Sequence, residues 1–369
     1  WRTSMTAARN EGDAEAVARA QAGVGLSRVA LGEVAAASSG LEQALSRLPQ
    51  GDPMWAQAAE ALASARLSRG DVDGSQRLWS ELLDLGKEMG EGAVHARAMA
   101  GLGLISMVQG QIDSGRDDLE NAVFRMRDQT ATKMLPLSVL RLAELAHAEG
   151  RLEAARELSL NADSLARDLP HLPACVAALG LASRCLRDIG IPHEARLIAQ
   201  DAVTLSRNIG AVETVSDVVS ILPAVGASEV LPNITPPKDA QTVGIDDPIG
   251  GMLAIKSRIV LERNPTVAVA LARQVIDRSR APLGWARARH LLDAAFTLVT
   301  AEDGRAAEAV QAALEAVPEP RFRLLRMEAG LLGEKIGMNG SFVEEAHKIY
   351  AQLEHQLGSP EGFRERWLG

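Results

Sequence analysis

The sequence predicts an all-α protein, an α-solenoid of stacked antiparallel helix pairs, and three observations support this fold class. Four glycines stand forty residues apart, and a repeat of roughly 20 to 50 residues is typical of solenoids and arrays. Each glycine lies between two alanine-rich apolar segments that are long enough to form helices. The composition is 47% hydrophobic but only 3% aromatic, which is typical of helices that pack closely through alanine and leucine. The four glycines are Gly70, Gly110, Gly150 and Gly190.

Each repeated glycine is predicted to form the turn between two helices. Glycine adopts the left-handed conformation that ends a helix without the steric cost of a Cβ atom. An aliphatic residue follows two positions later at Val72, Ile112 and Leu152, where it can hold the second helix against the first. Pro192 occupies that position in the fourth repeat, and proline suits the first turn of a helix, where its missing N–H would have no partner.

Small residues recur at fixed distances from each turn, seven positions before the glycine and five positions after it. Small side chains at facing positions allow two helices to approach closely, so we expect these pairs to touch. The pairs are Ala63 with Ser75, Gly103 with Gly115, Ala143 with Ala155, and Ser183 with Ala195.

This pattern of a small residue, a glycine turn and further small residues resembles the tetratricopeptide repeat (TPR). The match is best from Leu62 to Leu82 and from Leu142 to Ala162, and the resemblance covers about two thirds of the chain. The unit is forty residues long, whereas the family's unit is about 34, and leucine, methionine and alanine replace the usual aromatics. Longer units look like the repeats fused to bacterial signalling kinases and ATPase-type transcription regulators. The resemblance implies a right-handed superhelix whose first helices line a concave groove.

Three segments are expected along the chain. Residues 1–222 read as N-terminal TPR-like repeats, 223–250 as a Pro/Gly-rich linker or loop, and 251–369 as C-terminal helical repeats with a capping helix. The dense prolines and glycines of 223–250 break helices, so this segment is either a disordered hinge or a loop that docks on the repeats.

The first two units depart from the forty-residue period, as terminal repeats often do, and the last pairs return to a period close to forty and then slightly shorter. At the start, we expect a short pair within 5–22, with a turn near Asn10 to Asp13, and a second pair formed by 24–37 and 41–48. Asp52 is expected to cap a helix that Pro53 begins. After residue 210, 211–222 reads as one more first helix. The final pairs are expected at 252–262 with 266–278, 283–299 with 305–316, and 322–336 with 342–357, and 361–368 is expected to place Phe363, Trp367 and Leu368 over the last core.

Composition and motifs point away from catalysis. A net charge of −9 disfavours nonspecific nucleic-acid binding, which depends on cationic contacts with phosphates. Cys175 and Cys185 read as small buried hydrophobes in a reducing compartment. No apolar run approaches the roughly 20 residues of a membrane span. The sequence has no phosphate loop, no metal-binding histidine spacing and no nucleophile elbow, and Gly23–Gly25 and Gly101–Gly103 read as helix-packing glycines. We therefore expect a non-enzymatic, cytoplasmic, bacterial protein that needs no cofactor, metal or membrane.

The predicted function is a protein-interaction scaffold or regulatory module that binds a peptide or partner domain in its groove. Two alternatives remain: the chain is the regulatory repeat tail of a larger signalling kinase or ATPase-type regulator, with an upstream domain as its partner, or it is a small-molecule-sensing domain. The start at Trp1 suggests a fragment. Arg184 and Arg187 stand out because arginine can hold a carboxylate with paired hydrogen bonds. The groove positions that the TPR resemblance implies are Gln57, Glu60, Ser64, Arg97, Met107, Glu144, His147, Arg184 and Arg187.

Overall fold

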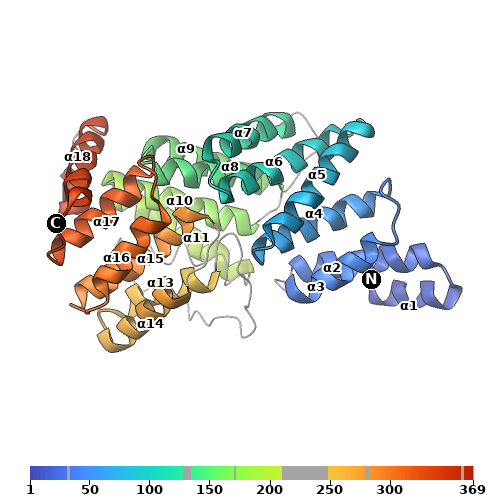
Figure 1. Cartoon of the computed structure of the whole chain (residues 1–369), viewed down its shortest axis with the longest axis horizontal. Coiled ribbons are helices and arrows are strands. Elements are labelled where there is room, and N and C mark those ends of the chain that lie inside the picture. Colours follow the sequence, from blue (N-terminus) through green and yellow to red (C-terminus); the bar gives the residue numbers. More distant parts are fainter. Residues whose placement is uncertain are drawn as a thin grey trace. The chain divides into compact units, whose positions relative to one another are not determined.

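The computed structural model describes residues 1–30, 34–127, 134–169, 172–209, 248–278, 283–358 and 361–368. Over these ranges, helices are the sole regular secondary structure (Figure 1). The chain divides into two compact units. Unit 1 contains residues up to Met134, and unit 2 contains the described residues from Leu135 onward. This confirms the predicted all-α fold of sequential helix pairs.

The helices follow one another as hairpins. Unit 1 contains α1 (Arg2–Glu11), α2 (Ala14–Ala30), α3 (Val34–Leu45), α4 (Pro53–Ser68), α5 (Val72–Glu88), α6 (Gly92–Val108) and α7 (Ile112–Arg127). Helix α8 (Met134–Ala148) begins at the division between the units. Unit 2 continues with α9 (Leu152–Asp168), α10 (Leu172–Ile189), α11 (Pro192–Ile209), α13 (Pro248–Val260), α14 (Pro265–Arg278), α15 (Gly284–Thr300), α16 (Ala306–Ala316), α17 (Arg323–Lys335), α18 (Ser341–Gln356) and α19 (Glu361–Leu368).

The four repeated glycines form the predicted left-handed turns, with φ between 80° at Gly150 and 98° at Gly190. The same hydrogen bond closes each turn: the N–H after the glycine donates to the carbonyl five residues earlier. Asp71 donates to Arg66 at 2.9 Å, and Ile191 donates to Leu186 at 2.8 Å. This bond satisfies a carbonyl that the helix end would otherwise leave unpaired. The second helices begin where the sequence predicts, at Val72, Ile112, Leu152 and Pro192.

The predicted small-residue pairs are buried at the helix contacts. The hydroxyl of Ser75 donates to the carbonyl of Ala63 at 2.8 Å, and that of Ser183 donates to the carbonyl of Ala195 at 2.6 Å. A Cβ atom added to Gly103 would lie 2.9 Å from the carbonyl oxygen of Gly115. The helices of a pair therefore approach each other closely at these positions.

The N-terminal helices differ from the predicted boundaries. Helix α2 runs through Gly23 and Gly25, and α3 runs through the expected break at Gly40. The glycines of α2 are packing positions, because an added Cβ would lie 2.3 Å from the ring of Trp1 at Gly23 and 2.6 Å from Leu41 at Gly25. The predicted cap of α4 is confirmed, since a carboxylate oxygen of Asp52 accepts the N–H of Met54 at 2.7 Å.

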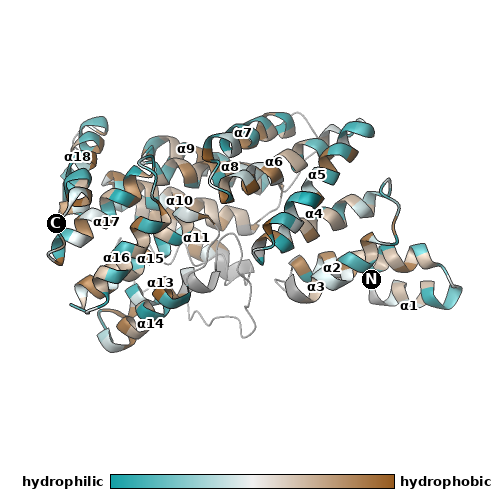
Figure 2. Ribbon diagram, in the orientation of Figure 1, coloured by the Kyte–Doolittle hydropathy of each residue, from teal (hydrophilic) through white to brown (hydrophobic). Residues whose placement is uncertain are grey.

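Unit 2 has two layers. We call the first helix of each pair (α8, α10, α13, α15 and α17) an inner helix and the second (α9, α11, α14, α16 and α18) an outer helix. From Ala174 to Ile189, every residue of α10 except Ala177 is buried, whereas the outer helices bury one face. Figure 2 shows this difference as pale to brown residues along α10 and alternating brown and teal residues on α18. A helix that is buried all round indicates contact with other helices on several sides.

The last helix returns to the middle of the chain. Phe363 and Trp367 of α19 are 0% and 5% exposed, and they share a core cluster with Leu152 and Ile189. The indole Nε1 of Trp367 donates to the carbonyl of Asp188 at 3.2 Å. The predicted capping helix is thus present, but the expected burial of Leu368 is wrong, because that side chain is 52% exposed.

The predicted segments at 1–222, 223–250 and 251–369 remain predictions, as does the handedness of the superhelix. Repeats on both sides of 223–250 belong to unit 2. Of that segment, the structure describes 248–250, which begin α13, and the helix expected at 211–222 lies outside the described residues. Among the helices in the described ranges, none is long and apolar enough to cross a membrane.

Candidate functional site: a charged pocket between the inner helices of unit 2

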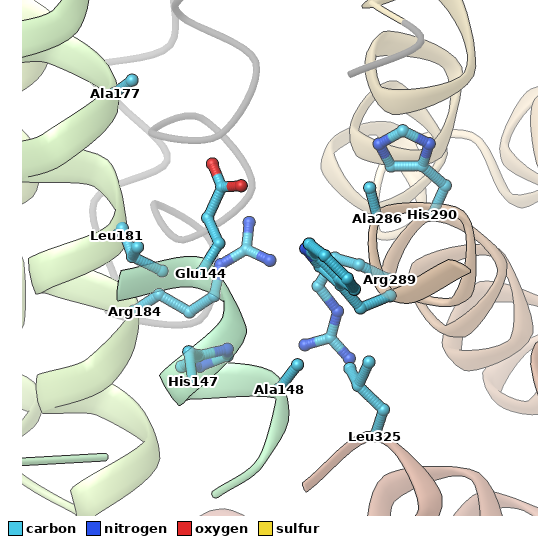
Figure 3. Close-up of a pocket in the computed structure, with 11 residues that line it drawn as sticks. Glu144, His147, Ala148, Ala177, Leu181, Arg184, Ala286, Arg289, His290 and Leu325 are labelled. Carbon is cyan, nitrogen blue, oxygen red and sulfur yellow. The ribbon is translucent and has the colours of Figure 1, made fainter. Parts of the chain in front are cut away.

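A pocket lies between inner helices that are distant in sequence. One wall comes from α8 and α10 and the other from α15 and α17 (Figure 3). The empty volume is about 640 Å³, part of which is open to solvent. The lining combines charged, aromatic and aliphatic side chains. It consists of Glu144, His147, Ala148, Ala177, Leu181, Arg184, Trp285, Ala286, Arg289, His290 and Leu325.

The pocket's charged side chains stand on helices that are otherwise apolar. Arg184 and Arg187 are 6% and 4% exposed, and Asp188, next to Arg187, is 0% exposed. On the opposite wall, Arg289 is 8% exposed. Charged side chains are almost never buried unless they are paired, so the unit must supply partners for them.

Asp188 is the centre of the first ion network. One carboxylate oxygen lies 2.9 Å from Nε2 of His147. The other accepts hydrogen bonds from Arg187, at 2.7 Å from its Nε, and from Arg366 of α19, at 3.3 Å from its Nε. This one carboxylate thus connects α8, α10 and α19.

These contacts set the protonation states of the pair. Burial raises the pKa of Asp188, but Arg187, the hydrogen bond from His147 and Arg366 outweigh it and hold the pKa well below the usual range. Burial lowers the pKa of His147 below its usual value, and Asp188 opposes that shift only in part. At neutral pH, a neutral His147 therefore donates its Nε2 proton to the ionised carboxylate of Asp188.

A second ion network lies on the opposite wall. Arg289 of α15 pairs with Glu328 of α17, and Arg258 of α13 pairs with Asp293 of α15 at 2.6 Å. Burial raises the pKa of Glu328, but Arg289 and Arg366 outweigh it and lower the pKa. Both carboxylates are held ionised, because Arg258 and Arg289 likewise outweigh burial at Asp293 and lower its pKa.

Among the residues that the structure describes, the pocket and its two networks contain more positive than negative side chains. Burial, and then the neighbouring Arg187, lower the pKa of Arg366 to about 10. Among the described residues of the pocket and its networks, two more guanidinium groups than carboxylates are present. The cations are Arg141, Arg184, Arg187, Arg258, Arg289 and Arg366, and the anions are Glu144, Asp188, Asp293 and Glu328.

Two buried donors in the lining make no hydrogen bond to another described residue. They are Nε1 of Trp285 and Nε of Arg289, on side chains that are 4% and 8% exposed. Buried polar groups in proteins are nearly always hydrogen-bonded. The arrangement therefore provides two N–H donors, which suit a ligand with acceptor oxygens.

The predicted groove residues of unit 2 meet at this pocket. Glu144, His147 and Arg184 line it, and Arg187 lies behind it in contact with Asp188. Figure 3 shows Glu144 and Arg184 on one wall and Arg289 on the other. Three of the four are more deeply enclosed than an open groove implies, and Glu144 is half-buried, with Oε2 2.7 Å from Arg141.

The predicted groove residues of unit 1 form no such cluster. Gln57 and Ser64 are exposed, and Met107 is buried. Glu60 and Arg97 form a half-buried ion pair at 2.7 Å between α4 and α6. Burial raises the pKa of Glu60, and Arg97 opposes that rise in part. The partner-binding role of all nine positions remains a prediction.

The sequence analysis did not single out the far wall of the pocket, formed by Trp285, Arg289 and Leu325, or the carboxylates Asp188 and Glu328. One signal was available: charged residues interrupt helices that are apolar on every face, as Asp188 does in α10, and such residues mark buried contacts.

Both cysteines of the sequence lie on α10. Burial raises the pKa of the Cys185 thiol far above its usual range, which suppresses the reactive thiolate. Cys185 and Cys175 are both buried and free, as predicted for small hydrophobes. Within the described ranges, no group of three or more His, Cys, Asp or Glu side chains is arranged to hold a metal ion.

Comparisons with known proteins find similarity to solved structures alone. No protein-family model matches the chain, and no curated protein matches its sequence. Among solved structures, the P58(IPK) TPR domain is 18% identical, with 95% of this chain and 96% of that chain covered and a TM-score of 0.24. A human IFIT1 dimer with m7Gppp-AAAA is 14% identical, with 92% and 77% covered and a TM-score of 0.35. These TM-scores are too low to bear on the fold, the ligand or the partner.

Proposed function

We propose that this chain is a non-catalytic recognition module, and that the pocket of unit 2 receives a side chain or chain end of a partner protein. The observation that supports this most strongly is the pocket itself, because its charged and apolar groups converge from four inner helices. Concave sites with a few placed polar groups among apolar ones are the usual form of ligand-binding sites. TPR-like helix pairs typically serve as protein-binding scaffolds, which agrees with a protein partner.

The test is a random-peptide display selection on the whole chain and on two matched variants. Ala286→Phe places a ring into the pocket, since Ala286 lines it. Ala270→Phe adds the same ring on the exposed surface of α14. Peptides enriched by the unmodified chain and by Ala270→Phe, but not by Ala286→Phe, would support the proposal. Equal enrichment by all three would contradict it.

Charge reversal at Arg184 and Arg187 is a poor test of this function. Arg187 pairs with the buried Asp188 at 2.6 Å, so Arg187→Glu would place two carboxylates side by side with no water to screen them. Loss of binding in that variant would report disruption of the unit. The Ala286→Phe variant changes the volume of the pocket and leaves every ion pair in place.

A small molecule is the second candidate ligand. The pocket combines apolar side chains such as Leu181 and Leu325 with a few polar ones, which is the usual lining of a small-ligand site. A thermal-shift screen against metabolites decides between the candidates, because a compound that stabilises the unmodified chain but not Ala286→Phe would favour a sensing role. The association with a larger bacterial signalling kinase or ATPase-type regulator and a cytoplasmic location remain proposals from the sequence alone.

A further inference from the structure

We propose that α19 is a C-terminal latch that joins the two walls of the pocket while it is docked and lets them separate when it is released. The proposal concerns the motion of the walls, so it does not depend on which ligand the pocket binds. Three features support it: a chain of polar contacts that crosses between the walls through α19, the backbone contact of α19 with α10, and the unfavourable burial of a charge in the docked helix.

The chain of polar contacts has Arg366 of α19 at its centre. On the first wall, Nε2 of His147 lies 2.9 Å from Asp188, whose other carboxylate oxygen is 3.3 Å from Nε of Arg366. The guanidinium of Arg366 also lies 3.9 Å from a carboxylate oxygen of Glu328, which pairs with Arg289 on the second wall. Figure 3 shows the two ends of this chain, His147 and Arg289, on facing walls. Release of α19 therefore breaks the chain between Asp188 and Glu328.

The backbone of α19 connects the two groups of helices that form the pocket. Among the described helices, its contact with α10 is the most extensive backbone contact between α8–α11 and the helices from α13 onward. A Cβ atom added to Gly362 of α19 would lie 2.1 Å from the carbonyl oxygen of Gly190, in the turn after α10. Phe363 and Trp367 anchor the helix, since both are buried. The ring of Phe363 stacks on Tyr350 of α18 with a centroid distance of 5.3 Å, so α19 contacts both groups.

Docking of α19 includes an opposing contribution, which makes the helix suited to release. Burial, and then Arg187, lower the pKa of Arg366 to about 10, and the attraction of Asp188 and Glu328 does not compensate. The charged guanidinium is therefore less stable in the docked helix than in water. Helix α19 has eight residues, and helices shorter than about 12 to 15 residues are marginal in water without tertiary contacts. Its two aromatic anchors must hold it in place, so loss of an anchor should release the whole helix.

The test is hydroxyl-radical footprinting of the whole chain, read by mass spectrometry, because labelling of a side chain increases with its exposed area. Three buried tryptophans report on different parts of the molecule. Trp367, 5% exposed, reports release of α19; Trp285, 4% exposed, reports separation of the walls; and Trp79, 2% exposed in α5, reports the integrity of unit 1.

Two variants should release α19 by different means. Phe363→Ala removes an anchor that is 0% exposed, and its control is Leu368→Ala on the same helix, where the side chain is 52% exposed. Gly362→Ala retains every side chain and favours the helical conformation, but its Cβ would clash with the carbonyl of Gly190. Its control is Glu365→Ala, which also favours the helix and changes an exposed position.

The latch predicts that labelling of Trp367 and Trp285 rises several-fold together in both variants, because both side chains start almost fully buried. The two controls, and Trp79 in every variant, should match the unmodified chain. Circular dichroism must show unchanged helical content, and Gly362→Ala decides the matter if Phe363→Ala unfolds.

Faster labelling of Trp367 with no change at Trp285 would overturn the proposal, because α19 would then cap the last core without holding the walls. Continued protection of Trp367 in a folded Gly362→Ala variant would also overturn it, because the helix would not be detachable. Neither result bears on the proposed function, which the display selection tests separately.

Discussion

Replacing Asp188 with asparagine is expected to lower the free energy of unfolding of unit 2 by about 3 to 5 kcal/mol, the usual cost of removing one member of a buried ion pair. Asparagine has nearly the same size, so the change removes charge and leaves packing intact. The carboxylate is 0% exposed and accepts from Arg187 and Arg366, and both cations would lose their common partner. Total stabilities are about 5 to 15 kcal/mol, so the loss is a large fraction.

The assay must report unit 2 alone, because the chain contains two compact units. Hydrogen exchange across a urea series, read by mass spectrometry on peptides from α10 and α19, meets this need. The matched control is Asp277→Asn, which weakens an exposed ion pair with Arg305 at 2.9 Å. Exposed ion pairs contribute little, so the control should exchange like the unmodified chain. If Asp188→Asn also does so, the reasoning about the buried network is refuted.

Two further predictions concern pH and the turn glycines. Acid should destabilise unit 2 in two steps. Below about pH 6.5, the unfolded chain binds a proton that native His147 does not, because the native pKa of His147 is lowered. Below about pH 4, unfolded Asp188 and Glu328 bind protons that their native forms do not, because their native pKa values are also lowered. Thermal unfolding across pH should show both steps, and His147→Gln should lose the first; its persistence would assign that step elsewhere. Gly70→Ala should cost about 1 to 2 kcal/mol for the left-handed conformation alone, whereas Gly190→Ala should cost more and release α19, because its Cβ would lie 2.2 Å from the backbone nitrogen of Phe363. Equal costs in urea unfolding would show that α19 does not pack on this turn.

Local structure was predictable from the sequence because its causes are local. The left-handed turn at Gly150 and the start of the next helix at Leu152 follow from the preferences of a few adjacent residues. The contact of Ser75 with Ala63 follows from spacing within one hairpin. The error in α2 has the same origin, because local composition suggested a helix end near Gly23. In the structure the helix continues, and its glycines leave room for Trp1 and Leu41 to pack against it.

The pocket was only half predictable. The resemblance to TPR arrays placed Arg184, Glu144 and His147 on inner faces, and the structure places all three in the pocket lining. It could not show that these faces meet α15, because Arg289 lies more than a hundred residues farther along the chain and a repeat period says nothing about which faces meet. Nor could it show that α19 returns to Asp188, since that contact depends on the path of all the intervening repeats.

The most direct test of the pocket as a recognition site is a crystal structure of the chain with the peptide that the display selection enriches most. The account predicts density for a side chain or chain end of that peptide beside Leu181 and Leu325, which line the pocket. Peptide density only elsewhere on the chain, or an empty pocket in a crystal whose solvent channels reach it, would contradict the account.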